Sequence, residues 1–342
     1  MATRRPRFAP AILMLASLAT VPVWLHGLRP AQADEETVTG LPLPSFMGAR
    51  PGEAVAGLIY RGGIEMRSEA DTFGGLSGLG FAGPDNHLVM VSDRGNFISG
   101  QLLYDEKAEP IGLIGVTVTP VLNTKGNDIP RASARDAEAL AIIERDGQPA
   151  AVRVAFENVT RVADFDLINL VPEGKAREVT IPGWLSRLRN NRSLEAACIA
   201  PSASPIAGST LLITEGMKDN DGLHSAVLLG RNDKGPLSYR AAEGMSPTDC
   251  AFLPDGDLLV LERGIGLLSF TMRLVRISAS AVKPEADLSG TELLSASGAD
   301  IDNMEALAVH TGPDGTTRIT LVSDNNFNEW ERSLLLEFSL PR

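Results

Sequence analysis

Short apolar segments rich in Val, Ile and Leu recur along the chain, separated by turns rich in Gly, Pro, Asp and Asn. Two of these turns are Gly83-Pro84-Asp85-Asn86 and Pro254-Asp255-Gly256-Asp257. Segments of this length and composition, bounded in this way, predict β-hairpins and not helices. The chain is therefore predicted to be all-β.

Five of the segments open with related phrases, and each is followed by a segment that ends in Asp or Glu. The opening phrases are GGLSGLGF, DAEALAII, RSLEAACIA, SPTDCAFL and NMEALAVH, and the closing phrases are HLVMVSDRG, VRVAFEN, LLITEG, LLVLERG and ITLVSDN. When the opening phrases are aligned, one position in each is occupied by Ser77, Glu138, Glu195, Thr248 and Glu305. Successive members of this set are 61, 57, 53 and 57 residues apart. A repeat of about fifty residues is typical of propeller blades.

Further strand-like segments follow each closing acid, and stretches such as GLIGVTVTPVL and EVTIPGWL offer a fourth strand per unit. We therefore expect a β-propeller of five four-stranded blades, an architecture that leaves only short protected strand edges. The run Gly57 to Glu69 is expected to close the ring by adding an outer strand to the C-terminal blade. The alternatives are six blades, with a degenerate one hidden in 105–135 or 280–300, and a β-sandwich or pair of sheet domains.

The first 33 residues have the pattern of a cleaved export signal. Arg4, Arg5 and Arg7 precede an apolar stretch, and Ala31-Gln32-Ala33 offers a small-residue cleavage site. A retained transmembrane anchor, the alternative, would need about twenty apolar residues. The arginine pair is one residue away from twin-arginine spacing, so both the Sec and the Tat route are open. We expect a signal peptide at 1–33, a lead-in segment at 34–56 and a single propeller domain at 57–342.

The net charge of the chain excludes some classes of binding partner. Removing residues 1–33 discards four arginines and no acids, so the formal net charge of −12 becomes −16. Such a surface repels nucleic acid and anionic lipid. We expect no nucleic-acid partner, no membrane insertion after signal cleavage, and a monomer.

The two cysteines, Cys198 and Cys250, lie on the expected inner strands of neighbouring blades. Aligning Pro201 with Pro254 places the two side chains on opposite faces of their strands. An oxidising compartment would permit a bridge, but from this register we expect two buried free thiols.

Acidic residues are expected to gather at one mouth of the central channel. The opening position starts an inner strand and the closing acid ends the next, antiparallel strand, so both lie at the same end of a hairpin. The expected metal ligands at this mouth are Asp93, Glu138, Glu157, Glu195, Glu215, Asp249, Glu262, Glu305 and Asp324. Carboxylates so close together need compensation, and Ca²⁺ takes about six to eight oxygen ligands. The alternatives are compensation by nearby arginines, namely Arg94, Arg161, Arg263 and Arg332, and a purely structural role as hairpin caps.

A few residues beside these acids are candidates for catalysis. His224 is the only histidine expected on the acidic face, where it could act as a base; the alternative is a solvated loop histidine. A carboxylate, with Glu195 the first choice, could replace it. Arg94 or Arg263 would bind a substrate oxyanion.

The combination of GLSGL, VSDRG, AEALAI, SLEAA, ITEG, SPTDCAFLPDGDLLVLER, NMEALAV and LVSDNNF resembles the phytase-like family of exported bacterial proteins with esterase-like activity. The resemblance runs from about residue 55 to the C-terminus. It implies a β-propeller, a periplasmic or secreted location, and calcium together with a phosphate ester at one channel mouth, as in propeller phytases.

This chain lacks the dense Lys and Arg set that a highly phosphorylated inositol would need. The expected function is therefore Ca²⁺-dependent hydrolysis of a simpler small-molecule ester or phosphoester. The alternative is a noncatalytic propeller that binds a ligand or an envelope protein, with metal in a structural role.

Overall fold

Hairpins joined by tight turns make up nearly all of the chain that can be described. The computed structural model describes Met1 and residues 34–341 except 231–233 and 267–268, so the expected signal peptide lies outside the described residues. Asn86 and Gly256, in the two turns singled out above, have positive φ angles of 55° and 93°. These residue types tolerate such angles, which explains why each strand reverses there.

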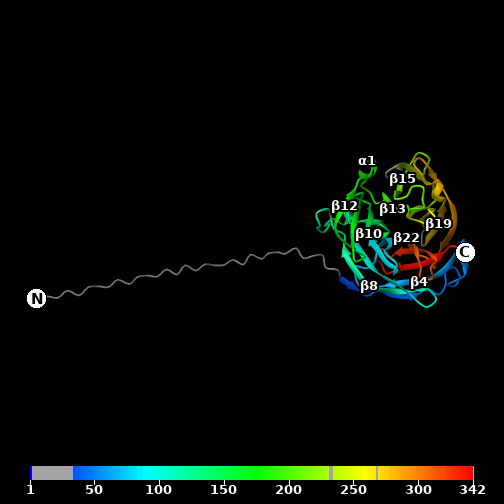
Figure 1. Cartoon of the computed structure of the whole chain (residues 1–342), viewed down its shortest axis with the longest axis horizontal. Coiled ribbons are helices and arrows are strands. Elements are labelled where there is room, and N and C mark those ends of the chain that lie inside the picture. Colours follow the sequence, from blue (N-terminus) through cyan, green and yellow to red (C-terminus); the bar gives the residue numbers. More distant parts are fainter. Residues whose placement is uncertain (2–33, 231–233, 267–268, 342) are drawn as a thin grey trace. The chain divides into compact units, whose positions relative to one another are not determined.

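The described residues form five sheets, one for each predicted blade, and Figure 1 looks down on the ring that they make. Blade 1 contains β5 (Leu76–Phe81), β6 (His87–Ser92), β7 (Asn96–Tyr104) and β8 (Pro110–Pro120). Blade 2 contains β9 (Ala137–Arg145), β10 (Gln148–Phe156), β11 (Arg161–Ile168) and β12 (Val171–Val179). Blade 3 contains β13 (Leu194–Ile199), β14 (Thr210–Lys218), β15 (His224–Leu229) and β16 (Gly235–Tyr239), with β20 (Asp287–Leu288) parallel to β16.

The remaining two blades follow the same plan. Blade 4 contains β17 (Ser246–Phe252), β18 (Leu258–Ile265), β19 (Phe270–Ile277) and β21 (Thr291–Ser297). Blade 5 contains β22 (Asn303–Thr311), β23 (Thr317–Asp324), β24 (Ser333–Ser339) and β4 (Leu58–Arg67). Segments 105–135 and 280–300 complete blades 1, 3 and 4, so the propeller has five blades and not six.

Helices are minor elements of the described residues. They are α1 (Gly183–Ser186) and the 3-10 turns η1 (Ala132–Ala134) and η2 (Ala279–Ala281). None of the described helices has the length and apolar character required to cross a membrane.

The ring closes by pairing the two ends of the propeller. Strand β4 pairs antiparallel with β24, from Met66 opposite Ser333 to Ile59 opposite Ser339. The predicted closure by the run Gly57 to Glu69 is confirmed.

The segment before β4 pairs with the outer strands of two neighbouring blades. Strand β1 (Asp34–Glu36) pairs with β8 of blade 1, whereas β2 (Thr39–Pro42) and β3 (Ala54–Val55) pair with β4 of blade 5. Phe46 is buried here, with its ring edge-on to Phe338 at 5.1 Å between centroids. This segment therefore contributes sheet edges to blades 1 and 5 and, through Phe46, core packing between blades 4 and 5.

Facing surfaces of neighbouring blades enclose the hydrophobic core. The cluster between blades 3 and 4, for example, includes Ala196, Ile213 and Leu228 from one sheet and Val260 and Val275 from the other. Alternate residues of each strand point to opposite faces, so each sheet supplies apolar side chains to the blades on both sides.

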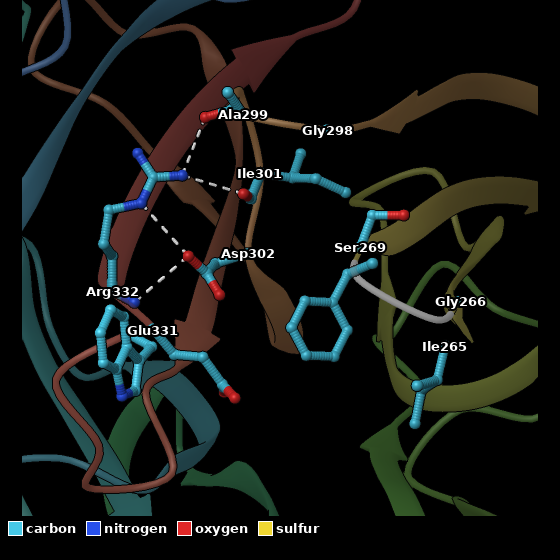
Figure 2. Close-up of a pocket in the computed structure, with 11 residues that line it drawn as sticks. Ile265, Gly266, Ser269, Gly298, Ala299, Ile301, Asp302, Glu331 and Arg332 are labelled. Carbon is cyan, nitrogen blue, oxygen red and sulfur yellow. Dashed lines mark hydrogen bonds and ion pairs between the residues drawn. The ribbon is translucent and has the colours of Figure 1, made fainter.

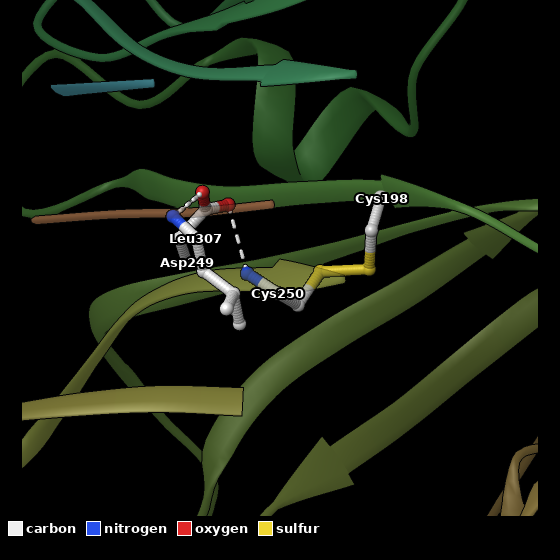
Figure 3. The surroundings of a disulfide bond; sticks show 4 residues. All are labelled: Cys198, Asp249, Cys250 and Leu307. Carbon is white, nitrogen blue, oxygen red and sulfur yellow. Dashed lines mark hydrogen bonds between the residues drawn. A yellow bond between two sulfur atoms is a disulfide. The ribbon is translucent and has the colours of Figure 1, made fainter. Parts of the chain in front are cut away.

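Cys198 and Cys250 form a disulfide, with 5.6 Å between their Cα atoms, so the prediction of two free thiols is wrong (Figure 3). The alignment expected from the sequence is correct: Cys198 and Ala251 each lie three residues after the bulge residue of their strand, Glu195 and Thr248 respectively. The error was to infer that side chains on opposite faces of equivalent strands cannot meet. Stacked blades present opposite faces to each other, so side chains on opposite faces of equivalent strands meet across the gap.

Candidate metal centre

A local irregularity aims the predicted acids into the channel. Each of the five opening positions lies at a break in the register between the inner strand and its neighbour, where the strand has one extra residue. A β-bulge of this kind leaves the extra residue unpaired and re-aims its side chain. The bulge residues are Ser77, Glu138, Glu195, Thr248 and Glu305.

Three of these bulge residues bring their carboxylates together. One oxygen each of Glu138, Glu195 and Glu305 lies within 4.8 Å of the other two, and the three side chains are 9%, 5% and 7% exposed. A second group, with the same spacing, consists of Asp136, Glu138 and Glu157. Glu138 belongs to both, so the two groups are adjacent. We call the five residues the acidic centre.

Asp136 was missed by reasoning from the sequence. It lies two residues before Glu138 in the opening phrase DAEALAII, and its carboxylate accepts a hydrogen bond from the side-chain amide of Asn158. The signal available was its place in the same phrase. The other four opening phrases have no acid at that offset, so the repeat did not point to it.

Three predicted ligands border the acidic centre. Glu215 is held by Arg192 at 3.0 Å and lies 3.8 Å from Arg263. Asp324 accepts a hydrogen bond of 2.6 Å from the backbone amide of Asn326. Asp93 has a buried Oδ1 without a hydrogen-bond partner. A buried carboxylate oxygen in this condition is costly unless a proton or a cation compensates it.

Two other predicted ligands have partners of their own away from these groups. Glu262 is fully buried, accepts a hydrogen bond from the Tyr239 hydroxyl and pairs with Arg273 at 3.1 Å. Asp249 is also fully buried and accepts hydrogen bonds of 2.8 Å from the backbone amides of Cys250 and Leu307 (Figure 3). These contacts tie strands and blades together.

The two hydroxyl residues at bulge positions bond to the backbone. Ser77 donates to the carbonyl of Gly75 at 3.1 Å, and Thr248 donates to that of Met304 at 3.3 Å. The bulge is therefore used for structure in blades 1 and 4 and presents carboxylates in blades 2, 3 and 5.

The four arginines suggested as compensating charges occupy different places. Arg263, whose side chain is 12% exposed, pairs with Glu305 and also donates to the Asn303 side chain at 2.8 Å. Arg94 is exposed, with its guanidinium 3.3 Å from the centre of the Phe327 ring. Arg161 donates to backbone carbonyls and stacks on Phe156, and Arg332 pairs with Asp302 at 3.2 Å. Of the four, only Arg263 pairs with the acidic centre.

Burial and mutual repulsion raise the pKa values of the acids. The pKa values of Glu138 and Glu195 lie well above the usual range, first because of burial and then because of neighbouring carboxylates. Burial, assisted by Asp136, raises the pKa of Glu157 to about 8, and burial raises that of Asp93 to about 6. Burial alone would lower the pKa of Arg263, but the negative charges of Glu305 and Glu195 outweigh the effect of burial, so this pKa is raised. One guanidinium does not balance this many carboxylates.

His224 begins β15 and is 1% exposed, so it is not a solvated loop histidine. Its Nδ1 lies 3.2 Å from the carbonyl oxygen of Thr214, and burial lowers its pKa. Its described hydrogen bond is to backbone and not to the acidic centre.

Known proteins provide one decisive match. A family model described as "Phytase-like: Esterase-like activity of phytase" matches residues 71–327, from the turn before β5 to the loop after β23. The chain belongs to the phytase-like family. No curated protein matches it. A solved "glucose dehydrogenase" aligns at 12% identity and a TM-score of 0.43, covering 78% of this chain and 98% of that chain.

The acidic centre of this phytase-like propeller fits the metal ions that such propellers use. Both of its groups consist only of carboxylates, which are ligands for hard cations and not for soft metals. The surplus of carboxylates, which the single guanidinium of Arg263 does not balance, is a further observation that a bound cation would explain.

Proposed function

We propose that the protein is an exported, Ca²⁺-dependent hydrolase that acts on small-molecule esters or phosphoesters at the acidic mouth. The observation that carries the proposal is the convergence of Glu138, Glu195 and Glu305, from three blades, within 4.8 Å. Family membership supports an esterase-like activity. The N-terminal pattern supports export, and the disulfide suits an oxidising compartment.

In this proposal each group of carboxylates holds one cation. Glu138, Glu195 and Glu305 would bind the first, and Asp136 and Glu157 would share Glu138 with a second. A bound cation supplies Lewis acidity and lowers the pKa of water. Arg263 keeps Glu305 in place and limits the net charge of the centre.

Proton transfer is assigned to Asp93, at the border of the centre. Its Oδ1 has no hydrogen-bond partner, and its pKa of about 6, raised by burial, suits a base that works near neutral pH. His224 is the alternative base, although its ring nitrogen contacts the Thr214 carbonyl. Arg94, exposed and stacked on Phe327, would orient the anionic oxygen of the substrate.

The proposal is tested by measuring thermal unfolding of residues 34–342, with chelator and with Ca²⁺, together with hydrolysis of p-nitrophenyl esters and phosphates. A cation that binds only the native state raises its stability. We expect Ca²⁺ both to raise the melting temperature and to be required for turnover. No effect of Ca²⁺ on either quantity would refute the proposal.

Glu195→Gln tests the centre itself. We expect it to abolish calcium-dependent turnover and to reduce the calcium-induced rise in melting temperature. The matched control is Glu337→Gln, since Glu337 is a fully buried glutamate on β24 that accepts hydrogen bonds from Tyr104 and His310. We expect the control to lose stability but to keep its response to Ca²⁺.

A noncatalytic binding propeller is the second candidate, favoured by the burial of the three bulge glutamates, which are at most 9% exposed. A cation there would tie the inner strands of blades 2, 3 and 5. In that case Ca²⁺ would raise the melting temperature of the wild type, Glu195→Gln would remove the rise, and neither protein would hydrolyse the panel.

A further inference from the structure

An exposed apolar surface borders one cavity between blades 4 and 5. Apart from Met1, Ile265 and Trp330 are the two most exposed large hydrophobic residues among those described, at 70% and 92%. Both line a cavity of about 700 Å³, shown in Figure 2. Its apolar lining also includes Phe270 and Ile301, and its polar lining includes Asp302, Glu331 and Arg332.

The cavity adjoins the acidic mouth. On β18, residues Arg263 and Ile265 lie two apart and so point to the same face of the sheet. The side chain of Arg263 contacts Asn303 and Glu305 on β22. Ile265 lies two residues further along β18, at its end. Asp302 directly precedes Asn303. On the other side, Asn326 connects the two: its side-chain amide donates to Glu331 at 2.7 Å and its backbone amide donates to Asp324 at 2.6 Å.

The loop that carries Trp330 is well anchored. Asn328 Oδ1 accepts hydrogen bonds of 2.9 Å from the backbone amides of both Trp330 and Glu331. Arg332 donates to Asp302 Oδ2 at 3.2 Å and to the carbonyl oxygens of Ala299 and Ile301 at 2.8 and 2.9 Å (Figure 2). The indole is thus presented to solvent on a loop fixed by hydrogen bonds, which is the arrangement expected of a preformed contact surface.

The lining also limits which ligand fits. The one arginine of the cavity, Arg332, is paired with Asp302, while Glu331 adds a further carboxylate. A polyphosphorylated group would meet no unpaired cation among these lining residues. A flat apolar ring would instead cover Trp330 and Ile265 and remove their surface from water.

We propose that this cavity binds a flat aromatic group of the substrate, with Trp330 as its stacking surface and Ile265 as a second apolar contact. The inference rests on the proposed function and deepens it, since it makes aryl esters the substrate class. The ester bond would then lie over the acidic centre, on the side of Arg263.

The test is calorimetric titration of the purified protein with 2-naphthol, a neutral aryl alcohol that cannot be hydrolysed. We expect Trp330→Ala to raise Kd by about tenfold or more, and Ile265→Ala to raise it by a smaller factor. The matched control is Ile168→Ala, because Ile168 is also exposed, at 49%, but ends β11 in blade 2. We expect the control to bind as the wild type does.

Two results would overturn the inference: no binding of 2-naphthol to the wild type, or equal binding by wild type and Trp330→Ala. Hydrolysis of 2-naphthyl acetate separates this inference from the proposed function. Binding that depends on Trp330, without hydrolysis of 2-naphthyl acetate or of the p-nitrophenyl panel, would refute the hydrolase and keep the aryl site. Hydrolysis with the same KM in wild type and Trp330→Ala would refute the aryl site and keep the hydrolase.

Discussion

Acids of this propeller divide, according to their partners, into structural residues and proposed metal ligands. Asp249 accepts hydrogen bonds from two backbone amides, on β17 and β22. Asp249→Asn would replace one acceptor oxygen with an amide nitrogen, leaving a buried N–H unpaired at a cost of about 1–3 kcal/mol. We expect that loss in denaturant unfolding, with the calcium-induced stabilisation unchanged. If the stabilisation disappeared, Asp249 would belong to the metal centre after all.

Asp136 is the opposite case, because its carboxylate groups with Glu138 and Glu157. We expect Asp136→Asn to weaken calcium binding by at least about tenfold, equivalent to about 1.4 kcal/mol, in a calorimetric titration with Ca²⁺. Asp166→Asn is the control, since Asp166 is a half-exposed acid of the same blade that pairs with Arg177. Equal affinities in the two variants would exclude Asp136 as a ligand.

Some of these roles could be predicted from the sequence and some could not. Glu138, Glu195 and Glu305 share a position in the repeat, so their convergence followed from blade geometry. Glu262 also occupies a repeated position, yet its carboxylate bonds to Tyr239 and Arg273 and does not join the acidic centre. Those partners come from other strands and have no counterpart in the repeat. Partner choice is a property of packing and not of the motif.

At the scale of elements, the repeat predicted the hairpins, the blades and their closure. The repeat did not predict how one sheet packs on another. That packing brings Cys198 and Cys250 close enough to form a disulfide. The β-bulges are similar: the opening phrase marks where they occur, but only the pairing with the next strand shows that the register shifts there.

The disulfide joins inner strands across the gap between blades 3 and 4 and encloses a segment with a sequence separation of 52. Bridges of this kind stabilise proteins by about 2–4 kcal/mol. We therefore expect dithiothreitol to lower the urea midpoint of the wild type. A Cys198→Ala/Cys250→Ala variant should start from the lower midpoint and show no response to the reductant. An unchanged wild-type midpoint would mean that the bridge is absent or adds no stability.

At the scale of the whole molecule, the collected carboxylates make metal-free stability depend on pH. Folding raises the pKa of Glu157 from 4.5 to about 8, mainly through burial. Between these values the native state binds more protons than the unfolded state, so stability falls as pH rises. We expect the melting temperature in chelator to fall from pH 5 to pH 8, and Ca²⁺ to restore more at pH 8. A chelated protein that became more stable over this range would contradict the raised pKa values.

Closure by β4 has a consequence for how the molecule reaches its native state. Met66 must find Ser333, a partner that is synthesised 267 positions later. Contacts so distant in sequence carry a large loop-closure entropy and slow folding. Blades 1 to 4 can form in order as the chain grows, but the last sheet waits for the final residues. A nascent chain therefore keeps one unpaired strand edge until β24 has been synthesised, and a truncation that removes β24 would leave that edge permanently open.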